Sequence, residues 1–285
     1  MTADPRSLST RKPVTRPIWL GQGRRRLGAL LLAPVYRLYT TRLRQEIHRS
    51  VLPTHVAVIL DGNRRWAGAS GLQDPGAGHQ AGANKLDELL DWCAALGIEQ
   101  VTVWALSNEN LARPEQELAA LLEVVADKLD ALAALHGEQS MRIRVFGRLD
   151  DLPQQLRHSI ETVEEATAHN TGLRLNIAIG YSGRDELVDA SRALIRQLAL
   201  EGVASGAMAE RITGEALARH LYTAGEPDPE LIIRTSGEVR LSGFLLWQGV
   251  HSELYFADVD WPAFRELDFL RALRSYEQRR RRYGR

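Results

Sequence analysis

The sequence has very little cysteine: Cys93 is the only one among its 285 residues. One thiol excludes an internal disulfide framework and any zinc site built from clustered cysteines, and it suits a reducing, cytoplasmic compartment. Leu86, Leu89, Leu90 and Leu96 fall on the same helical face as Cys93. We therefore expect this thiol to pack in the core rather than to act as a nucleophile.

Long apolar runs are also missing. The run from Leu27 to Val35 is far shorter than the ~20 residues that a membrane-spanning helix needs. It also begins too late, and ends without the small residues of a cleavage site, to predict a signal peptide. Residues 27–50 instead predict a basic amphipathic helix that can lie on a bilayer or, more commonly, on the domain. Residues 1–26 predict a flexible basic tail.

The net charge of zero conceals an uneven distribution. Residues 1–50 carry a balance of +9 and residues 270–285 a balance of +6, so the body between them is acidic. Basic ends can meet nucleic acid, an anionic membrane surface, the acidic body or simply water, and composition does not choose among these. The body lacks a basic, aromatic recognition surface, so we expect no nucleic-acid partner.

Short β-rich runs alternate with longer helical patterns beyond residue 53. This alternation predicts a single α/β domain with a largely parallel sheet and helices on both faces. The predicted strands are 55–60, 100–106, 141–146, 173–179, 231–235, 244–248 and 253–257. The predicted helices are about 79–96, 114–135, 153–168, 184–202, 210–221 and 263–281, with Gly97 as a C-cap and Pro114 and Pro153 in first turns.

The sequence contains no P-loop or dinucleotide-binding motif. Ligands of parallel α/β sheets bind outside the carboxyl ends of the strands, so the polar residues that directly follow strands are the candidate ligand-binding residues. Asp61, Gly62, Asn63, Arg64 and Arg65 come directly after the first predicted strand. Asn63 and Arg65 suit a diphosphate, whereas a carboxylate repels an anion unless a divalent cation joins them. Asp61 is therefore interpreted as a magnesium ligand, with a helix N-cap as an equally weighted alternative.

Two further strand ends carry candidate residues. Arg234, Arg240 and Ser242 can hold a second diphosphate through forked and hydroxyl hydrogen bonds. Glu253 sits at the edge of an apolar stretch, where a glutamate either binds metal or forms a salt bridge. Together, two anion sites and two carboxylates indicate an enzyme that handles two diphosphates with Mg²⁺ between them.

Several ordered blocks of sequence resemble one known family. The blocks are residues 55–67 (HVAVILDGNRRWA), 78–82, 107–114, 175–184, 233–235, 244–248 and 253–256. They are similar to the cis-prenyltransferases, typified by undecaprenyl diphosphate synthase, over roughly residues 53–285. The resemblance implies that residues 51–285 form a magnesium-dependent catalytic domain. It would condense isopentenyl diphosphate with dimethylallyl, geranyl or farnesyl diphosphate and create a Z double bond.

The resemblance also implies roles for individual residues. Asp61 and Asn110 would be catalytic, and Asp61 and Glu253 would bind Mg²⁺. The implied substrate-binding residues are Gly62, Asn63, Arg64, Arg65, Trp66, His79, Ser107, Asn108, Glu109, Leu111, Arg113, Arg234, Arg240 and Ser242. The closing Arg282-Tyr283-Gly284 is similar to a C-terminal motif that reaches the partner's site in the family's dimers, which implies a homodimer. Apolar residues of the helix at 114–135 are either ordinary core or, as the resemblance implies, the wall of a hydrocarbon tunnel.

Some positions depart from the family pattern. Arg64 stands where most members have glycine, and no arginine occurs between Gly71 and His79, so Arg64 is a candidate to compensate. Leu111 replaces a usual tryptophan, as in the short-chain Z-farnesyl diphosphate synthase branch, whereas the small Ala105 resembles long-chain members. Product length is left open on these residues. A non-catalytic partner subunit is the main rival, although such subunits typically lose residues equivalent to Asp61 and Arg234.

Overall fold

The computed structural model describes residues 36, 38–48, 51–72, 74–134 and 141–283. The chain divides into two units, Met1–Leu43 and Arg44–Arg285, and the fold below is that of the second. Residues 38–46 are helical. The tail predicted for residues 1–26, and half of the helix predicted for 27–50, lie outside the described residues.

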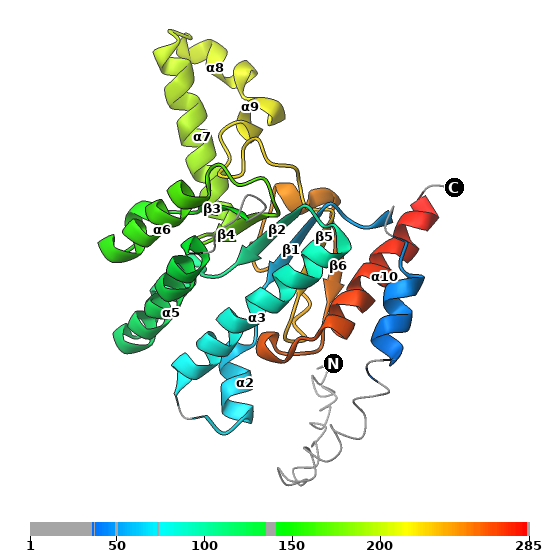
Figure 1. Ribbon diagram of the computed structural model, residues 1–285. Helices are drawn as coiled ribbons and strands as arrows, with labels where there is room; N and C mark the ends of the chain where they lie inside the picture. The colour runs from blue at the N-terminus through cyan, green and yellow to red at the C-terminus, as the bar shows by residue number, and fades with distance from the viewer. Residues whose placement is uncertain (1–35, 37, 49–50, 73, 135–140, 284–285) are drawn as a thin grey trace, which may run out of the picture. The chain divides into compact units, whose positions relative to one another are not determined.

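A six-stranded parallel sheet forms the centre of the second unit (Figure 1). The strand order is β3-β4-β2-β1-β5-β6. The strands are β1 (His55–Ile59), β2 (Gln100–Trp104), β3 (Arg142–Phe146), β4 (Arg174–Ala178), β5 (Leu231–Arg234) and β6 (Glu253–Phe256). Every residue of β1, β2 and β5 is buried, as expected for central strands of a parallel sheet that is covered on both faces. The predicted parallel α/β fold is confirmed.

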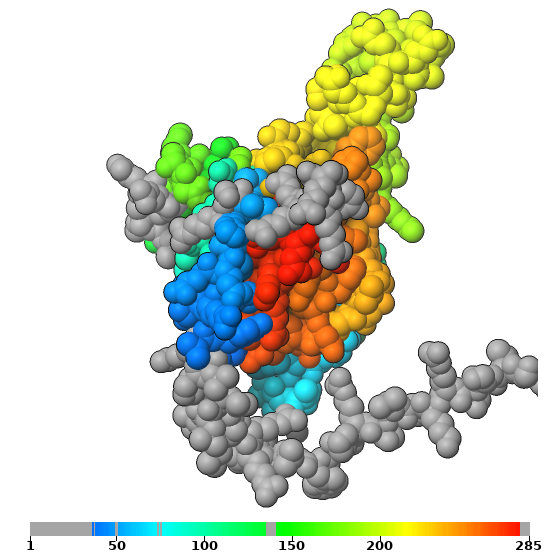
Figure 2. All heavy atoms as spheres, turned by 90° about the vertical axis from the view of Figure 1, so that its right-hand side faces the viewer, coloured from blue at the N-terminus to red at the C-terminus, as the bar shows by residue number. Residues whose placement is uncertain are grey.

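Helices flank this sheet. They are α2 (Asn63–Ala69), α3 (Pro75–Leu96), α4 (Asn108–Leu111), α5 (Glu115–Ala133), α6 (Gln154–Thr167), α7 (Gly183–Leu200), α8 (Ser205–Arg211), α9 (Gly214–Ala218) and α10 (Glu266–Tyr283). Helices α3, α5 and α6 lie side by side along the sheet (Figure 1). Helices α7 and α8 extend away from the sheet (Figure 1), and the yellow segment stands out from the surface in Figure 2.

Helix ends follow their local signals. Gly97 ends α3 with a left-handed φ of 80°, as predicted, and Cys93 is fully buried one turn earlier. Helix α3 begins at Pro75 rather than at residue 79, because the Asp74 carboxylate accepts a hydrogen bond from the Gly76 amide. The prolines at 114 and 153 each stand just before a helix, so their predicted place in the first turn is wrong by one position.

Two predicted elements are wrong. Residues 244–248 form no strand, because Gly243 and Leu245 have φ values of 93° and 44° and turn the chain into the 3-10 helix η3 (Gln248–His251). Phe244 and Leu245 are nevertheless buried, so burial in the core explains the apolar run. The helix predicted at 210–221 is split into α8 and α9, because the Thr213 hydroxyl caps α9 by accepting from the Ala216 amide at 3.1 Å.

The strand order creates a crevice at one edge of the sheet. Strand β1 lies between β2 and β5. The chain leaves β1 toward β2 and leaves β5 toward β6, in opposite directions. Connections that diverge in this way open a ligand-binding crevice outside the carboxyl ends of the strands. The segments that follow β1, β2 and β5 therefore meet there.

Candidate active site

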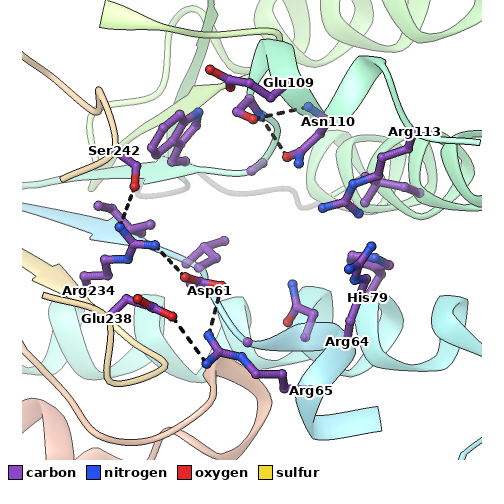
Figure 3. Close-up of a pocket in the computed structure, with 18 residues that line it drawn as sticks. Asp61, Arg64, Arg65, His79, Glu109, Asn110, Arg113, Arg234, Glu238 and Ser242 are labelled. Carbon is purple, nitrogen blue, oxygen red and sulfur yellow. Dashed lines mark hydrogen bonds and ion pairs between the residues drawn. The ribbon is translucent and has the colours of Figure 1, made fainter. Parts of the chain in front are cut away.

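A polar cavity of about 780 Å³ opens at this crevice (Figure 3). It brings together twelve of the residues predicted from sequence, which are Asp61, Gly62, Asn63, Arg64, Arg65, His79, Ser107, Glu109, Asn110, Arg113, Arg234 and Ser242. These residues come from segments that are separated by up to about 180 positions, and only the parallel register of β1, β2 and β5 gathers them.

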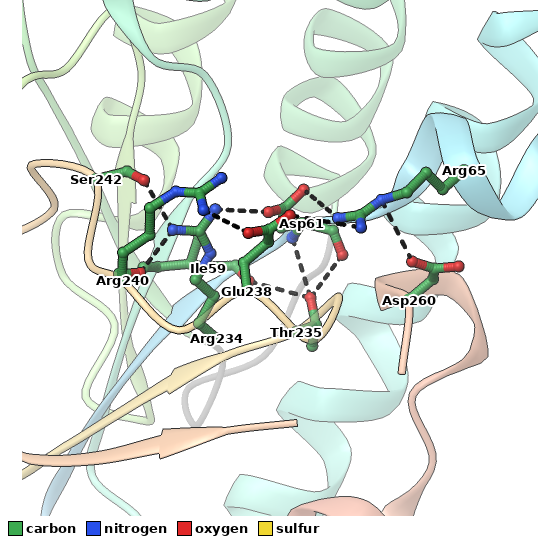
Figure 4. A network of polar contacts seen from close by, with 9 residues as sticks. All are labelled: Ile59, Asp61, Arg65, Arg234, Thr235, Glu238, Arg240, Ser242 and Asp260. Carbon is green, nitrogen blue, oxygen red and sulfur yellow. Dashed lines mark hydrogen bonds and ion pairs between the residues drawn. The ribbon is translucent and has the colours of Figure 1, made fainter. Parts of the chain in front are cut away.

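An ion pair between Asp61 and Arg234 lies at the centre of one wall (Figure 4). The Arg234 Nη2 atom donates to Asp61 Oδ2 at 2.7 Å, while Nη1 donates to the Arg240 carbonyl at 2.6 Å and to Ser242 Oγ at 2.8 Å. The fork of one guanidinium therefore holds two segments of the site in register. Arg234 is buried, whereas the Asp61 side chain keeps 31% of its surface exposed toward the cavity.

The charge of Asp61 is stabilised by this setting. Burial raises the pKa of Asp61, but the hydrogen bond from Arg234, the nearby Ser236 hydroxyl and the charges of Arg234 and Arg65 outweigh it, so the pKa lies below its ordinary value. The carboxylate is consequently ionised at neutral pH. The alternative that Asp61 caps α2 is wrong, because the N-cap is Gly62 and no side chain caps that helix.

Arg65 extends the same network (Figure 4). Its guanidinium lies 3.6 Å from Asp61 Oδ1, 3.7 Å from Glu238 Oε1 and 3.9 Å from Asp260 Oδ1. These are longer separations than the Arg234 contacts, and half of the Arg65 side chain is exposed. Arg65 is therefore held loosely enough to turn toward an anion that enters the cavity.

The backbone after β1 is locked in an unusual turn. The Thr235 hydroxyl accepts from the Asp61 amide at 3.0 Å and lies 2.7 Å from the Asp61 carbonyl oxygen. Gly62 has a φ of 108°, and a Cβ atom there would meet Asp260 Oδ1 at 2.5 Å. Ser236 and Ser242 also have positive φ values, of 82° and 51°. Strain concentrated around one cavity is typical of a functional site.

Asn110 faces the cavity from the segment that follows β2. Its Oδ1 atom accepts from the Ser107 amide at 3.1 Å, and the Asn110 amide donates to Ser107 Oγ at 3.3 Å. This reciprocal capping box starts the short helix α4. Because the cap holds the side-chain oxygen Oδ1, the side-chain nitrogen Nδ2 is the part of Asn110 that is suited to contact a ligand.

A second cationic group lies on the side of the cavity away from Arg234 and Ser242 (Figure 3). Arg64 and Arg113 each donate to Glu117 Oε1 at 3.0 Å. The hydrogen bond from Arg64 lowers the pKa of Glu117. Burial and the charge of Arg113 lower the pKa of His79, whose Nε2 is buried and has no partner among the described residues. The group therefore combines two cations, one carboxylate and a neutral imidazole that can still make a hydrogen bond.

Five predicted site residues do not line the cavity, namely Trp66, Asn108, Leu111, Arg240 and Glu253. Asn108 donates to Asp185 at 2.5 Å, and the Arg240 guanidinium pairs with Glu238 while its carbonyl supports Arg234. Glu253 begins β6 opposite Leu231, at the amino end of the sheet, and accepts from Arg279 at 2.8 Å. The prediction that Glu253 and Asp61 meet at one ion is therefore wrong for a single chain.

Sequence reasoning missed Glu117 and Glu238. Glu117 lies four residues after Arg113 at the start of α5, so the helical spacing was a usable signal for their contact. Glu238 gave no such signal, because it approaches Arg65 only through the turn after β5.

The chemistry of the donors fits Mg²⁺ in one respect. The described residues contain no group of three or more His, Cys, Asp or Glu side chains arranged to hold a metal ion. Mg²⁺ characteristically binds one or two carboxylates together with substrate phosphates and water rather than a complete protein cage. A single ionised carboxylate at the edge of an arginine-rich cavity, as Asp61 provides, suits that mode of binding.

An apolar cavity of about 70 Å³ adjoins the polar one. The two share Leu60, Asn63, His79, Ala105 and Leu121 in their linings. The remaining lining comes mainly from α3, α5 and the buried strands, namely Gly82, Ala83, Leu86, Val103, Val124, Val125, Lys128, Leu129, Ile177 and Trp261. A ligand with a charged head and an apolar tail matches this pair of cavities.

Comparisons with known proteins agree with this geometry. The family described as "Putative undecaprenyl diphosphate synthase" matches residues 59–284. A (2Z,6E)-farnesyl diphosphate synthase of Thermobifida fusca is 51% identical over 255 residues, which are 90% of this chain and 99% of that protein. An isoprenyl transferase of Thermus thermophilus is 49% identical over 92% of this chain and 99% of its own length.

A solved structure is similar as well. Lavandulyl diphosphate synthase from Lavandula x intermedia, in complex with dimethylallyl diphosphate, has a TM-score of 0.73 and 33% identity. The match covers 80% of this chain and 96% of that one. Among the described residues, no helix has the length and apolar character to cross a membrane.

Proposed function

The chain belongs to the undecaprenyl diphosphate synthase family of prenyltransferases, and from this premise we propose that it condenses isopentenyl diphosphate with an allylic diphosphate to give a Z-prenyl diphosphate. The observation that carries the proposal is the Asp61–Arg234 pair on one wall of a cavity whose opposite side carries a second cationic group. An enzyme that joins two diphosphate esters needs two anion sites whose reacting ends face each other.

The allylic diphosphate is assigned to the segment after β1. Gly62 and Asn63 begin α2, where backbone amides point toward an anion, and Arg65 is loosely held beside them. Arg64 and Arg113 add positive charge from the other side of the cavity. Isopentenyl diphosphate is assigned to Arg234, Arg240 and Ser242, with the Arg234 fork holding the loop after β5 in place.

Mg²⁺ is proposed as the cofactor, with Asp61 as its protein ligand. The ion would withdraw charge from the leaving diphosphate and neutralise the repulsion between that group and the carboxylate. Arg65 and Arg64 would stabilise the negative charge that grows on the leaving group. Asn110 would orient the reacting ends, and the apolar cavity would hold the hydrocarbon tail away from water.

The decisive experiment is incubation of the purified protein with Mg²⁺, labelled isopentenyl diphosphate and, separately, dimethylallyl, geranyl and farnesyl diphosphates. Extraction and chain-length analysis should reveal discrete Z-prenyl products. Asp61→Ala should abolish them, and chelation of Mg²⁺ should do so reversibly. No product with any of the three allylic substrates would instead favour a non-catalytic partner subunit.

A homodimer, a cytoplasmic location and a peripheral membrane contact complete the proposal. The family resemblance of Arg282-Tyr283-Gly284 supports the dimer, although the side chains of residues 280–283 and the whole of Gly284 lie outside what the structure describes. Sedimentation of the purified chain tests the dimer. Flotation with anionic vesicles, with a variant truncated at residue 50 as control, tests the membrane contact.

A further inference from the structure

An ion pair that joins α5 to α3 lies beside the apolar cavity. Among the described residues that line this cavity, Lys128 of α5 is the one with a permanent charge. Its ammonium contacts the Asp87 carboxylate of α3. The Lys128 side chain is 16% exposed and the Asp87 side chain 54% exposed. The aliphatic stem of Lys128 therefore lines the cavity, while its charged end meets Asp87 near the solvent.

Lys128 and Leu129 are the last residues of α5 that line the apolar cavity. Helix α5 begins beside the polar cavity, just after Arg113, and runs away from the carboxyl edge of the sheet. Leu121 lines both cavities, and Lys128 follows it by seven residues. At 1.5 Å per residue, this spacing corresponds to roughly 10 Å of apolar wall between the shared mouth and the ammonium.

That depth corresponds to a short hydrocarbon. An isoprene unit contributes four carbon–carbon bonds of about 1.5 Å in zigzag, or roughly 5 Å of length. The wall between Leu121 and Lys128 is therefore about two units long, with a third unit at the mouth beside Ala105 and His79. The cavity, at about 70 Å³, must widen along this wall to receive them. A longer tail would have to pass the ammonium, separate it from Asp87 and remove its hydration, which is unfavourable for an apolar group.

We propose that the Lys128–Asp87 ion pair is the stop that limits the apolar tail to about three isoprene units. This inference rests on the proposed prenyltransferase function and extends it to product length. Ala105 resembles long-chain members of the family and Leu111 resembles short-chain members, so these two residues predict different product lengths. In this proposal neither residue limits product length, because the limit is the Lys128–Asp87 pair.

The first test compares products of matched Lys128 variants. Lys128→Met keeps the length of the stem and removes the charge, Lys128→Ala removes both, and Lys128→Arg keeps a cation at the same place. We expect wild type and Lys128→Arg to give products of about three units. The fraction with four or more units should rise at least tenfold in Lys128→Met and further in Lys128→Ala. Unchanged product lengths in folded Lys128→Met and Lys128→Ala would overturn the proposal.

A binding series tests the same stop without catalysis. Octyl, dodecyl and hexadecyl phosphate are titrated into wild type and Lys128→Met. Burial of a methylene is worth roughly a fourfold gain in affinity. Wild type should therefore bind dodecyl phosphate more tightly than octyl phosphate, but should bind hexadecyl phosphate no more tightly than dodecyl phosphate. Lys128→Met should bind hexadecyl phosphate at least tenfold more tightly than wild type does.

The two tests separate the two ideas. A wild-type protein that makes no product with any allylic substrate refutes the proposed function, and the alkyl phosphate series then still decides whether Lys128 ends the cavity. Active wild type with identical chain-length dependence in all variants refutes the stop alone. Asp87→Asn is a second variant that breaks the pair from the exposed side and should lengthen products in the same direction as Lys128→Met.

Discussion

Replacement of Arg234 by lysine keeps the positive charge at this position but removes the planar guanidinium that donates to several partners at once. The guanidinium makes three short hydrogen bonds, to Asp61 Oδ2, the Arg240 carbonyl and Ser242 Oγ, at 2.6–2.8 Å. A lysine ammonium can keep the contact with Asp61 but cannot span all three partners. Two hydrogen bonds to a charged donor, each worth about 1.5–3 kcal/mol, are therefore weakened or lost.

The expected effect of Arg234→Lys is a decrease in the free energy of unfolding of about 2–4 kcal/mol, because the side chain is buried and its partners lose their donor. The loop after β5 would also lose its anchor. Binding of isopentenyl diphosphate should weaken at least about thirtyfold, which corresponds to roughly 2 kcal/mol.

Urea unfolding and calorimetric titration of isopentenyl diphosphate measure the two effects. Arg192→Lys is the matched control, because Arg192 of α7 is 60% exposed, contacts Asp189 at 3.2 Å and does not line the cavity. That change should leave unfolding within about 0.5 kcal/mol of wild type. Suppose that the free energy of unfolding of Arg234→Lys is also within about 0.5 kcal/mol of wild type, and that its affinity for isopentenyl diphosphate is within about threefold. The claim that the three hydrogen bonds of the guanidinium stabilise the fold and the binding site is then refuted.

The remaining predictions concern pH, backbone geometry and the second cationic group. Burial lowers the pKa of His55 from 6.5 to about 4, so the unfolded chain takes up a proton that the folded chain excludes. The free energy of unfolding should therefore fall by up to about 3 kcal/mol as the pH drops from 6.5 to 4. Urea titrations across that window should show His55→Gln losing this slope, and equal slopes would contradict it. Gly62→Ala should destabilise the fold by at least about 2 kcal/mol in thermal unfolding, because its Cβ would meet Asp260 and its φ is 108°. Arg64→Ala should raise the Michaelis constant for the allylic diphosphate about tenfold with little change in stability, because its side chain is 58% exposed. An unaltered constant would show that Arg64 does not compensate for the missing arginine between Gly71 and His79.

Much of the site could be predicted because its residues sit in short segments directly after apolar strands. Asp61 and Arg65 follow β1, Asn110 and Arg113 follow β2, and Arg234 ends β5. Parallel strands place their carboxyl ends at one edge, so a local pattern was enough to group these residues. Glu253 does not join this group, because it stands at the start of its strand rather than at the end.

Local patterns also misassigned some elements for a physical reason. The run at 244–248 is as apolar as a buried strand, but the left-handed residues at 243 and 245 turn it away from the sheet. Apolar character reports burial, and burial alone does not distinguish a strand from a buried turn. Helix α3 was located at its C-terminal end from Gly97, whereas its start was predicted four residues late because the cap by Asp74 was not recognised.

By itself, the sequence determined the fold class, the family and the residues that crowd the carboxyl edge of the sheet, because these depend on strand-by-strand patterns. Only the tertiary structure decided which charges meet. The contact of Arg234 with Asp61, of Arg64 with Glu117 and of Lys128 with Asp87 joins residues 173, 53 and 41 positions apart. Such pairs depend on strand register and helix packing, which no local pattern encodes, and they set the electrostatics of the site.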